Sequence, residues 1–288
     1  MKRGKFGGLM RWIRALRARH YDVVIDAQGL GRSAAITRLT GAPARIGHAD
    51  AREFARLGYN RAVRSVAVHT VDRMLDLLGP IGVPALRDMR LYSSDGAREW
   101  VTSHATLGGA GYAVFAPTSR WPGKCWDAAR FADLARIALS LGVDAVAVIG
   151  VNSERAQCAP LLELSAREPR VVDLVGGLTI ERMCALIERS AVVVSNDSAA
   201  AHIAVGFDRP LIAFYGPTDV SKVGPYGRER DALQHVTPGE RLDHKNEALG
   251  RALMDRITLD EAAQVLARRL SARPPAGDPS ASRPAARG

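Results

Sequence analysis

The sequence predicts an α/β protein whose main domain is a doubly wound parallel sheet, and three observations support this class. Short, mainly apolar runs alternate with amphipathic segments between residues 110 and 217. Strands that are apolar on both faces and separated by helices are typical of a parallel sheet covered on both sides. Polar residues follow the carboxyl ends of these runs, which is where ligands bind in such sheets.

The elements of this domain follow one another in a regular order. Strands are expected at 112–118, 144–150, 171–176, 191–197 and 210–216. Helices are expected between them, near 127–140, 153–167, 179–189 and 198–206. A last helix near 258–270 begins at Thr258, where Thr258 and Glu261 form a capping-box pattern.

The residues before 108 show a similar but incomplete pattern. The run YDVVIDAQG predicts a strand at 21–29 that is followed by a helix. Further short strands are expected in RIG and at RLY (90–92), with a helix near 69–79. These are too few strands for a free-standing α/β sheet.

Composition and these elements predict three regions. Residues 1–108 form an N-terminal α/β domain, and a Gly/Ala stretch near 108–111 separates it from the C-terminal α/β domain at 109–270. Residues 271–288 are rich in Pro, Ala, Gly and Ser, a composition that cannot bury a core.

The formal net charge of +10 is confined to the two ends of the chain. The first 19 residues hold seven Lys or Arg and no acid, and residues 268–288 hold five Arg and one Asp, so the remainder is close to neutral. This distribution argues against a nucleic-acid groove. The basic ends are either an attachment to an anionic membrane surface or merely solvated.

Targeting and redox signals are weak. No apolar run approaches the roughly 18 to 20 residues of a membrane span, and the basic N-terminus lacks the apolar core of a signal peptide, which predicts a cytoplasmic protein. The three cysteines have no CxxC spacing, so the sequence indicates neither a disulfide framework nor a zinc site.

One candidate binding site lies in SNDSAAAH. Asp197 and Ser198 stand where a strand ends and a helix begins, so the free backbone N–H groups of the helix can bind an anion such as a diphosphate. His202 follows one turn later on the same face. The alternative is that Asp197 and Ser198 only cap the helix and that His202 is structural.

Two neighbouring strand ends carry similar residues. In APTSRWPGKCW, Thr118 and Ser119 end a strand and Lys124 stands in the following turn, so hydroxyl and ammonium groups could stabilise a phosphate leaving group. In GPTD, Thr218 and Asp219 end the next strand, where they could hydrogen-bond the ligand. The chain contains no DxD pair, so no metal clamp for a diphosphate is predicted.

These motifs together resemble a known family. NDSAAAHIAVGFDRPLIAFYGPTD and VGPYG are similar to the C-terminal half of bacterial ADP-heptose:lipopolysaccharide heptosyltransferases, glycosyltransferase family nine, which have the GT-B fold of two Rossmann-like domains. YDVVIDAQGLGRSA, ARIGHADARE and HTVDRMLDLLG resemble the N-terminal domain of that family. The resemblance spans roughly residues 20 to 270.

The resemblance implies an activity and roles for individual residues. It implies inverting, metal-independent and cofactor-free transfer of a heptose from ADP-heptose to a Kdo or heptose of the lipopolysaccharide inner core. Thr118, Ser119 and Lys124 would contact the diphosphate, and Glu154 would hold the adenosine ribose. The heptose and phosphates would be bound by Asp197, Ser198, Ala199 and His202. Ser119 and Ala199 depart from the Thr and Gly that are more usual in the family.

The family's base-bearing turn, which resembles RLSALGD, has no counterpart in this sequence. The expectation is therefore an N-terminal domain that lacks its first strands, through either a misplaced start or a natural truncation. Asp26, at the end of YDVVIDA, is the acidic residue of this half that the pattern places at the cleft, and its alternative role is a turn residue. Two other functions stay open: a non-catalytic nucleotide-sugar-binding remnant, and a transferase of the same family that uses another sugar nucleotide.

Overall fold

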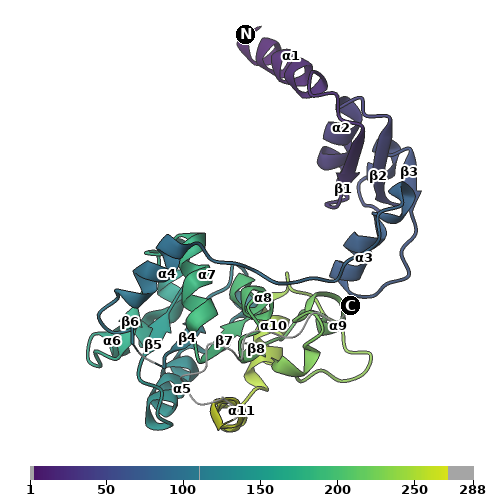
Figure 1. Ribbon diagram of the computed structural model, residues 1–288. Coiled ribbons are helices and arrows are strands. Elements are labelled where there is room, and N and C mark those ends of the chain that lie inside the picture. The colour runs from purple at the N-terminus through teal and green to yellow at the C-terminus, as the bar shows by residue number, and fades with distance from the viewer. Residues whose placement is uncertain (1–2, 110, 272–288) are drawn as a thin grey trace. The chain divides into compact units, whose positions relative to one another are not determined.

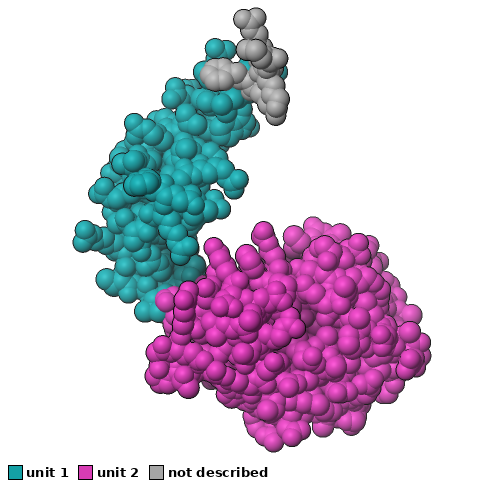
Figure 2. All heavy atoms as spheres, turned by 180° about the vertical axis from the view of Figure 1, so that it is seen from behind, with its two compact units in different colours: residues 1–88 teal, residues 89–288 magenta. Residues whose placement is uncertain are grey.

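A computed structural model describes residues 3–109 and 111–271 and divides the chain into two compact units, Met1–Asp88 and Met89–Gly288 (Figure 1, Figure 2). The division lies earlier than the junction expected near 108–111 because helix α4 (Asp95–Thr102) packs against α7 (Ile180–Arg189) of the second unit. Arg98 of α4 places its Nη2 atom 2.8 Å from Oε1 of Glu188 in α7. Apart from Ser271, the expected tail at 271–288 lies outside the described residues.

The first unit contains a three-stranded parallel sheet with the order β1-β2-β3. The strand expected at 21–29 is confirmed as β1, and the short strand expected in RIG is part of β2. The elements are α1 (Arg3–Arg17), β1 (Val23–Asp26), α2 (Gly31–Leu39), β2 (Ala44–His48), η1 (Ala55–Gly58), β3 (Arg61–Val63), α3 (Thr70–Asp76) and η2 (Gly79–Ile81).

One expected strand is wrong. The segment RLY at 90–92 forms no strand but runs extended against the end of α8 (Ala199–Gly206), where the Leu91 N–H donates to the Gly206 carbonyl at 2.8 Å. The absent side chain of Gly206 leaves room for Leu91. A segment of only three residues could not distinguish a sheet partner from a helix partner.

The second unit contains a six-stranded, entirely parallel sheet with the order β6-β5-β4-β7-β8-β9. All five strands and the helices expected for this domain are confirmed, except that the helix near 153–167 begins as a 3-10 helix. The strands are β4 (Ala113–Ala116), β5 (Val146–Val148), β6 (Val171–Asp173), β7 (Val192–Asn196), β8 (Leu211–Phe214) and β9 (Ala232–Leu233).

Helices cover both faces of this sheet (Figure 1). They are α4 (Asp95–Thr102), α5 (Ala128–Ser140), α6 (Ala159–Ser165), α7 (Ile180–Arg189), α8 (Ala199–Gly206), α9 (Val220–Val223), α10 (Glu247–Asp255) and α11 (Leu259–Ser271). Three short 3-10 segments are η3 (Pro122–Lys124), η4 (Asn152–Cys158) and η5 (Glu229–Asp231).

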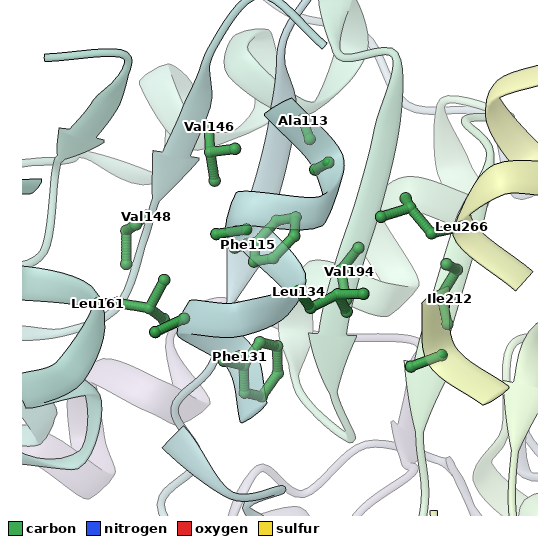
Figure 3. Packing of buried hydrophobic residues seen from close by; sticks show 14 of the residues in the cluster. Ala113, Phe115, Phe131, Leu134, Val146, Val148, Leu161, Val194, Ile212 and Leu266 are labelled. Atoms are coloured by element: carbon green, nitrogen blue, oxygen red, sulfur yellow. The ribbon is translucent and has the colours of Figure 1, made fainter. Parts of the chain in front are cut away.

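The sheet is buried between two apolar clusters. On one face Phe115 and Val194 pack against Phe131 and Leu134 of α5 and Leu266 of α11 (Figure 3). The other face packs against α4, α7 and α8. Fully burying a Leu, Val or Phe side chain contributes roughly 1.5 to 3 kcal/mol, so these clusters fix the strand ends in place.

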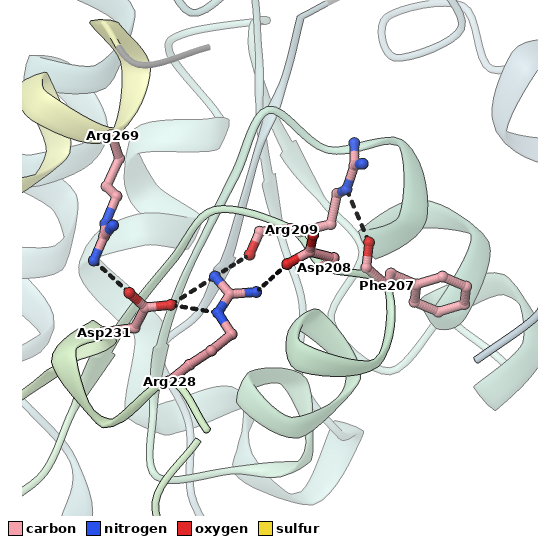
Figure 4. A network of polar contacts seen from close by, with 6 residues as sticks. All are labelled: Phe207, Asp208, Arg209, Arg228, Asp231 and Arg269. Atoms are coloured by element: carbon pink, nitrogen blue, oxygen red, sulfur yellow. Dashed lines mark hydrogen bonds and ion pairs between the residues drawn. The ribbon is translucent and has the colours of Figure 1, made fainter. Parts of the chain in front are cut away.

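A buried carboxylate anchors the segment that follows β8. Asp231 is buried and binds Arg228, whose Nε atom lies 2.7 Å from Oδ2, and Arg269 of α11 (Figure 4). Arg228 also donates to the Arg209 carbonyl at 2.7 Å. A buried charge needs such partners because its desolvation is costly. The network therefore ties β9 and the segment before it to α11.

Candidate functional site

The strand order of the second unit reverses between β4 and β7, and the site residues gather at this point. From β4 the chain adds β5 and β6 on one side of the sheet, then crosses to β7, β8 and β9 on the other. The loops after β4 and β7 therefore separate, and ligands bind in the crevice between such loops. Here Lys124 Nζ, from the loop after β4, lies 2.6 Å from Asp197 Oδ2, from the loop after β7.

The side chain of Asn196, at the end of β7, links these two loops by hydrogen bonds. Its Oδ1 atom accepts a hydrogen bond from the Trp126 backbone N–H at 3.0 Å, and its Nδ2 donates to the Pro117 carbonyl at 2.6 Å. Asn196 and Trp126 are buried, and Trp126 packs against Phe214 of β8. The ends of the loop that carries Lys124 are thus fixed before any ligand arrives.

The beginning of the same loop is held from the other side. Gln157 of η4 accepts from the Ser119 backbone N–H and donates to the Ser119 carbonyl, each at 3.1 Å. Thr118 lies beside Gly150 at the end of β5, where a side chain on residue 150 would come within 2.9 Å of Thr118 Oγ1. Both Thr118 and Ser119 are buried, at the strand end where the sequence placed them.

The N-terminus of α8 opens beside Asp197. Ser198 is the N-cap residue, yet its hydroxyl makes no capping hydrogen bond and its Oγ atom is buried without a partner among the described residues. Ala199 begins the helix, and His202 is exposed one turn later. The helix dipole and free N–H groups favour an anion at this end.

Thr218 and Asp219 have different environments. Thr218 Oγ1 is buried without a partner among the residues that the structure describes. Asp219 caps α9: it accepts from the Ser221 backbone N–H at 3.1 Å and lies 2.8 Å from Lys222. The Lys222 and Ser221 contacts hold the pKa of Asp219 below its ordinary value. These local contacts explain Asp219 as a helix cap.

Glu154 lies on η4, after β5, and is half-buried. Its charge acts on Cys125, the residue after Lys124. Burial is the main cause that raises the pKa of Cys125 to about 11, and a hydrogen bond to the Ser119 backbone acts in the opposite direction. The charge of Glu154 adds a smaller upward contribution. Glu154 therefore lies near the loop after β4, in the segment that follows β5.

Asp26 belongs to the first unit and is bound by four donors. Its Oδ1 accepts from the backbone N–H groups of Gln28 and Gly29, and its Oδ2 accepts from Ser33 Oγ at 2.8 Å and Tyr59 Oη at 2.6 Å. Burial raises the pKa of Asp26, but these hydrogen bonds outweigh it, and the pKa lies below its ordinary value. This environment favours the turn role that the sequence left open.

The arrangement in the second unit suits an anionic ligand. An ammonium group, a helix N-terminus and several hydroxyl groups converge at the switch point, and such groups stabilise negative charge that develops on a leaving phosphate. Within residues 3–109 and 111–271, no group of three or more His, Cys, Asp or Glu side chains is placed to hold a metal ion.

Sequence reasoning missed the residues that support the site. Asn196 and Gln157 carry no motif, although an Asn at the end of a valine-rich strand must find buried hydrogen-bond partners. The packing of α10 against η3 was also missed. Gly250 of α10 lies against Gly123, so that a side chain there would clash with the Gly123 carbonyl oxygen. The partners in these contacts are distant in sequence, and no local pattern reports them.

Comparisons with known proteins agree on one family. Residues 9–251 match the model of glycosyltransferase family 9 (heptosyltransferase). The chain is 29% identical to lipopolysaccharide heptosyltransferase 3 of Escherichia coli, over 75% of this chain and 65% of that protein. It is 30% identical to lipopolysaccharide heptosyltransferase 1 of E. coli K12, over 85% of this chain and 74% of that protein. The chain thus spans about two thirds to three quarters of the length of these relatives.

Solved structures share the fold. The chain matches E. coli ADP-heptose lps heptosyltransferase II with a TM-score of 0.74 and 22% identity, over 93% of this chain and 82% of that one. It matches E. coli heptosyltransferase WaaC with ADP-2-deoxy-2-fluoro heptose with a TM-score of 0.60 and 26% identity, over 86% and 76% of the two chains. These matches confirm the predicted GT-B fold class, with its two parallel sheets. The chain therefore belongs to glycosyltransferase family 9, the heptosyltransferase family.

Proposed function

We propose that this chain transfers a heptose from ADP-heptose to a Kdo or heptose of the lipopolysaccharide inner core, with inversion at the transferred carbon. The observation that carries the proposal is the Lys124–Asp197 pair at the switch point, beside the N-terminus of α8. Membership of the family supports heptose transfer. The solved WaaC complex, whose ligand is ADP-2-deoxy-2-fluoro heptose, supports an ADP-linked donor.

The donor diphosphate would be bound by cations and dipoles. Lys124 would donate a charge-assisted hydrogen bond to a phosphate oxygen and stabilise the charge that appears when the sugar–phosphate bond breaks. Thr118, Ser119 and the first turn of α8 would bind the same group. Glu154 would accept from the adenosine ribose, and Asp197, Ser198, Ala199 and His202 would surround the heptose.

The attacking acceptor hydroxyl must lose its proton to a general base, which typically contributes 10² to 10⁴ in rate. We do not give this role to Asp26, because its carboxylate already accepts four hydrogen bonds and its pKa is lowered. A carboxylate bound in this way is a weak and poorly accessible base. The proposal therefore concerns the donor half of the reaction most directly.

We also propose that α1 attaches the protein to the anionic membrane surface that carries the acceptor. Leu9, Met10 and Trp12 of this helix are 40% to 49% exposed, and the helix also carries Arg11 and Arg14. Basic helices with exposed apolar side chains lie in the plane of anionic membranes. Among the described residues, no helix has both the length and the apolar character needed to cross a membrane.

The proposed function is tested in two steps with the full chain. Titration calorimetry in EDTA should show ADP binding, because Lys124 and α8 supply the positive charge. A second assay follows transfer from ADP-heptose to a Kdo-lipid acceptor, with heat-denatured protein as the control. Absence of ADP binding would refute the proposal. ADP binding without transfer would favour a non-catalytic nucleotide-sugar-binding protein, and preference for another nucleotide would favour a different sugar donor.

A further inference from the structure

Tyr215 has a buried hydroxyl group that the proposed site does not use. The residue follows β8, is fully buried, and packs its ring in the apolar cluster that includes Ala200, Ala201 and Ala204 of α8. Its Oη atom is buried and has no hydrogen-bond partner in the part of the chain that the structure describes. Burying a hydroxyl without a partner is costly, so this group calls for an explanation.

The register of the sheet places Tyr215 beside Asp197. Asn196 of β7 pairs with Phe214 of β8, and the Asp197 backbone N–H donates to the Phe214 carbonyl at 3.1 Å. Asp197 and Tyr215 come directly after these two paired residues, so the register places them next to each other just beyond the ends of β7 and β8. Burial foremost, and then the Asp197 charge, raise the pKa of Tyr215, so its hydroxyl keeps its proton and can donate.

Asp197 has a partner that an anionic ligand would compete for. Lys124 Nζ lies 2.6 Å from Asp197 Oδ2, and both side chains are largely buried. A diphosphate at the N-terminus of α8 would attract the same ammonium group. Once Lys124 turns to the phosphate, Asp197 would be a poorly solvated carboxylate close to a second anion, and such a group needs a hydrogen-bond donor.

We propose that Tyr215 is a positioning residue of the donor site, which donates a hydrogen bond to the Asp197 carboxylate when a nucleoside diphosphate draws Lys124 away. Among the described residues the Tyr215 hydroxyl has no partner, while Lys124 holds Oδ2 of the Asp197 carboxylate. Ligand binding thus exchanges one partner of Asp197 for another. This inference rests on the proposed function, since it needs an anionic donor at the switch point.

The test compares Tyr215→Phe with Tyr112→Phe. Both tyrosines are fully buried in the same apolar cluster, but Tyr112 Oη donates to the Leu186 carbonyl at 2.7 Å. Each substitution removes one hydroxyl and keeps the ring. ADP affinity is measured by calorimetry in EDTA, and stability of the empty protein by urea unfolding.

The two substitutions should affect different properties: Tyr215→Phe the ADP affinity, and Tyr112→Phe the stability. Tyr215→Phe should raise the ADP Kd about 5- to 50-fold, as expected for loss of a hydrogen bond to a charged group. It should leave the urea midpoint unchanged or raise it, because an unpaired buried hydroxyl is removed. Tyr112→Phe should lower the urea midpoint, because it leaves the Leu186 carbonyl unpaired, and should leave the ADP Kd within about twofold.

A double-mutant cycle locates the acceptor. In the Asp197→Ala background, Tyr215→Phe should change the ADP Kd by less than about twofold, because the acceptor of its hydrogen bond is gone. Wild-type affinity in Tyr215→Phe, or an undiminished effect in the Asp197→Ala background, would overturn the inference while the proposed function stands. If the wild-type chain binds no ADP, the proposed function fails and the inference fails with it.

Discussion

The Nζ atom of Lys124 lies 2.6 Å from Oδ2 of Asp197, and this ion pair joins the loop after β4 to the loop after β7 where the strand order reverses. Both side chains are largely buried, so each neutralises a charge that would otherwise be poorly solvated. The pair holds an ammonium group at the N-terminus of α8 before a ligand arrives. Removing either partner therefore affects binding more than removing an exposed charge would.

Lys124→Ala should weaken ADP binding by about 1 to 3 kcal/mol, because a charge-assisted hydrogen bond to the diphosphate is lost. Calorimetry in EDTA measures the change. Lys222→Ala is the matched control: Lys222 also pairs with an aspartate, Asp219, but its side chain is 64% exposed. The control should bind ADP like the wild-type chain. Equal affinity in Lys124→Ala would remove Lys124 from the donor site.

Gly250→Ala should raise the ADP Kd and lower the free energy of unfolding by about 1 to 3 kcal/mol, because overpacking forces backbone shifts. The new methyl group would press on the backbone of Gly123, the residue before Lys124. Gly96→Ala is the control, since Gly96 is also helical and has open space around it. It should be neutral or stabilising by up to about 1 kcal/mol. Equal changes in ADP Kd and in free energy of unfolding for the two variants would contradict the clash of residue 250 with Gly123.

Asp26→Asn should act on stability rather than on the chemical step. Loss of the charged acceptor for Ser33, Tyr59 and two backbone N–H groups should lower the free energy of unfolding by about 1 to 3 kcal/mol. The transfer rate per folded molecule should fall by less than about tenfold, whereas a general base contributes 10² to 10⁴. A drop of that larger size, with unchanged stability, would restore Asp26 as the base.

His48 should make the first unit less stable in mild acid. Both ring nitrogens are buried without a partner among the described residues. Burial foremost, and then the charge of Arg73, lower the pKa of His48, although Asp50 and Asp76 act in the opposite direction. Because the folded pKa lies below the unfolded value of about 6.5, the unfolded chain binds more protons as the pH falls below 6.5. Stability should therefore be lost toward acid.

The slope of this loss is at most about 1.4 kcal/mol per pH unit, and it ends once the pH falls below the folded pKa. Urea unfolding between pH 7.5 and pH 5 measures it. In His48→Leu the contribution of this group disappears, so the variant should lose less stability than the wild type over the same interval. Identical pH profiles would show that folding does not change the pKa of His48.

Arg11→Gln with Arg14→Gln should weaken binding to anionic vesicles by roughly 1 kcal/mol per residue, and the wild-type binding should fade as salt is added. Sedimentation with vesicles of anionic or neutral lipid measures both effects. The control removes two exposed arginines from the second unit, Arg136→Gln with Arg251→Gln. Equal binding to both kinds of vesicle would refute a membrane role for α1.

The sequence by itself determined the doubly wound unit and the strand ends at which the candidate site lies. The strands of the second unit are apolar on both faces, and α5 and α7 have amphipathic repeats. Each of these patterns lies within one short segment, so it can be recognised without knowing which other segments pack against it. Thr118, Lys124 and Asp197 were predicted as site residues for a similar reason, because polar residues at or soon after the end of a buried strand are visible in the chain itself.

Tertiary structure decided what those residues contact. Only the strand order brings Lys124 and Asp197 within 2.6 Å of each other, 73 residues apart in sequence. The packing of the first unit also binds Asp26 in a turn through the distant Tyr59, and that of the second unit leaves the Tyr215 hydroxyl without a partner among the described residues. Periodicity reports which face of an element is buried, whereas hydrogen-bond partners depend on how distant segments meet, and that is fixed only by the packing of the whole unit.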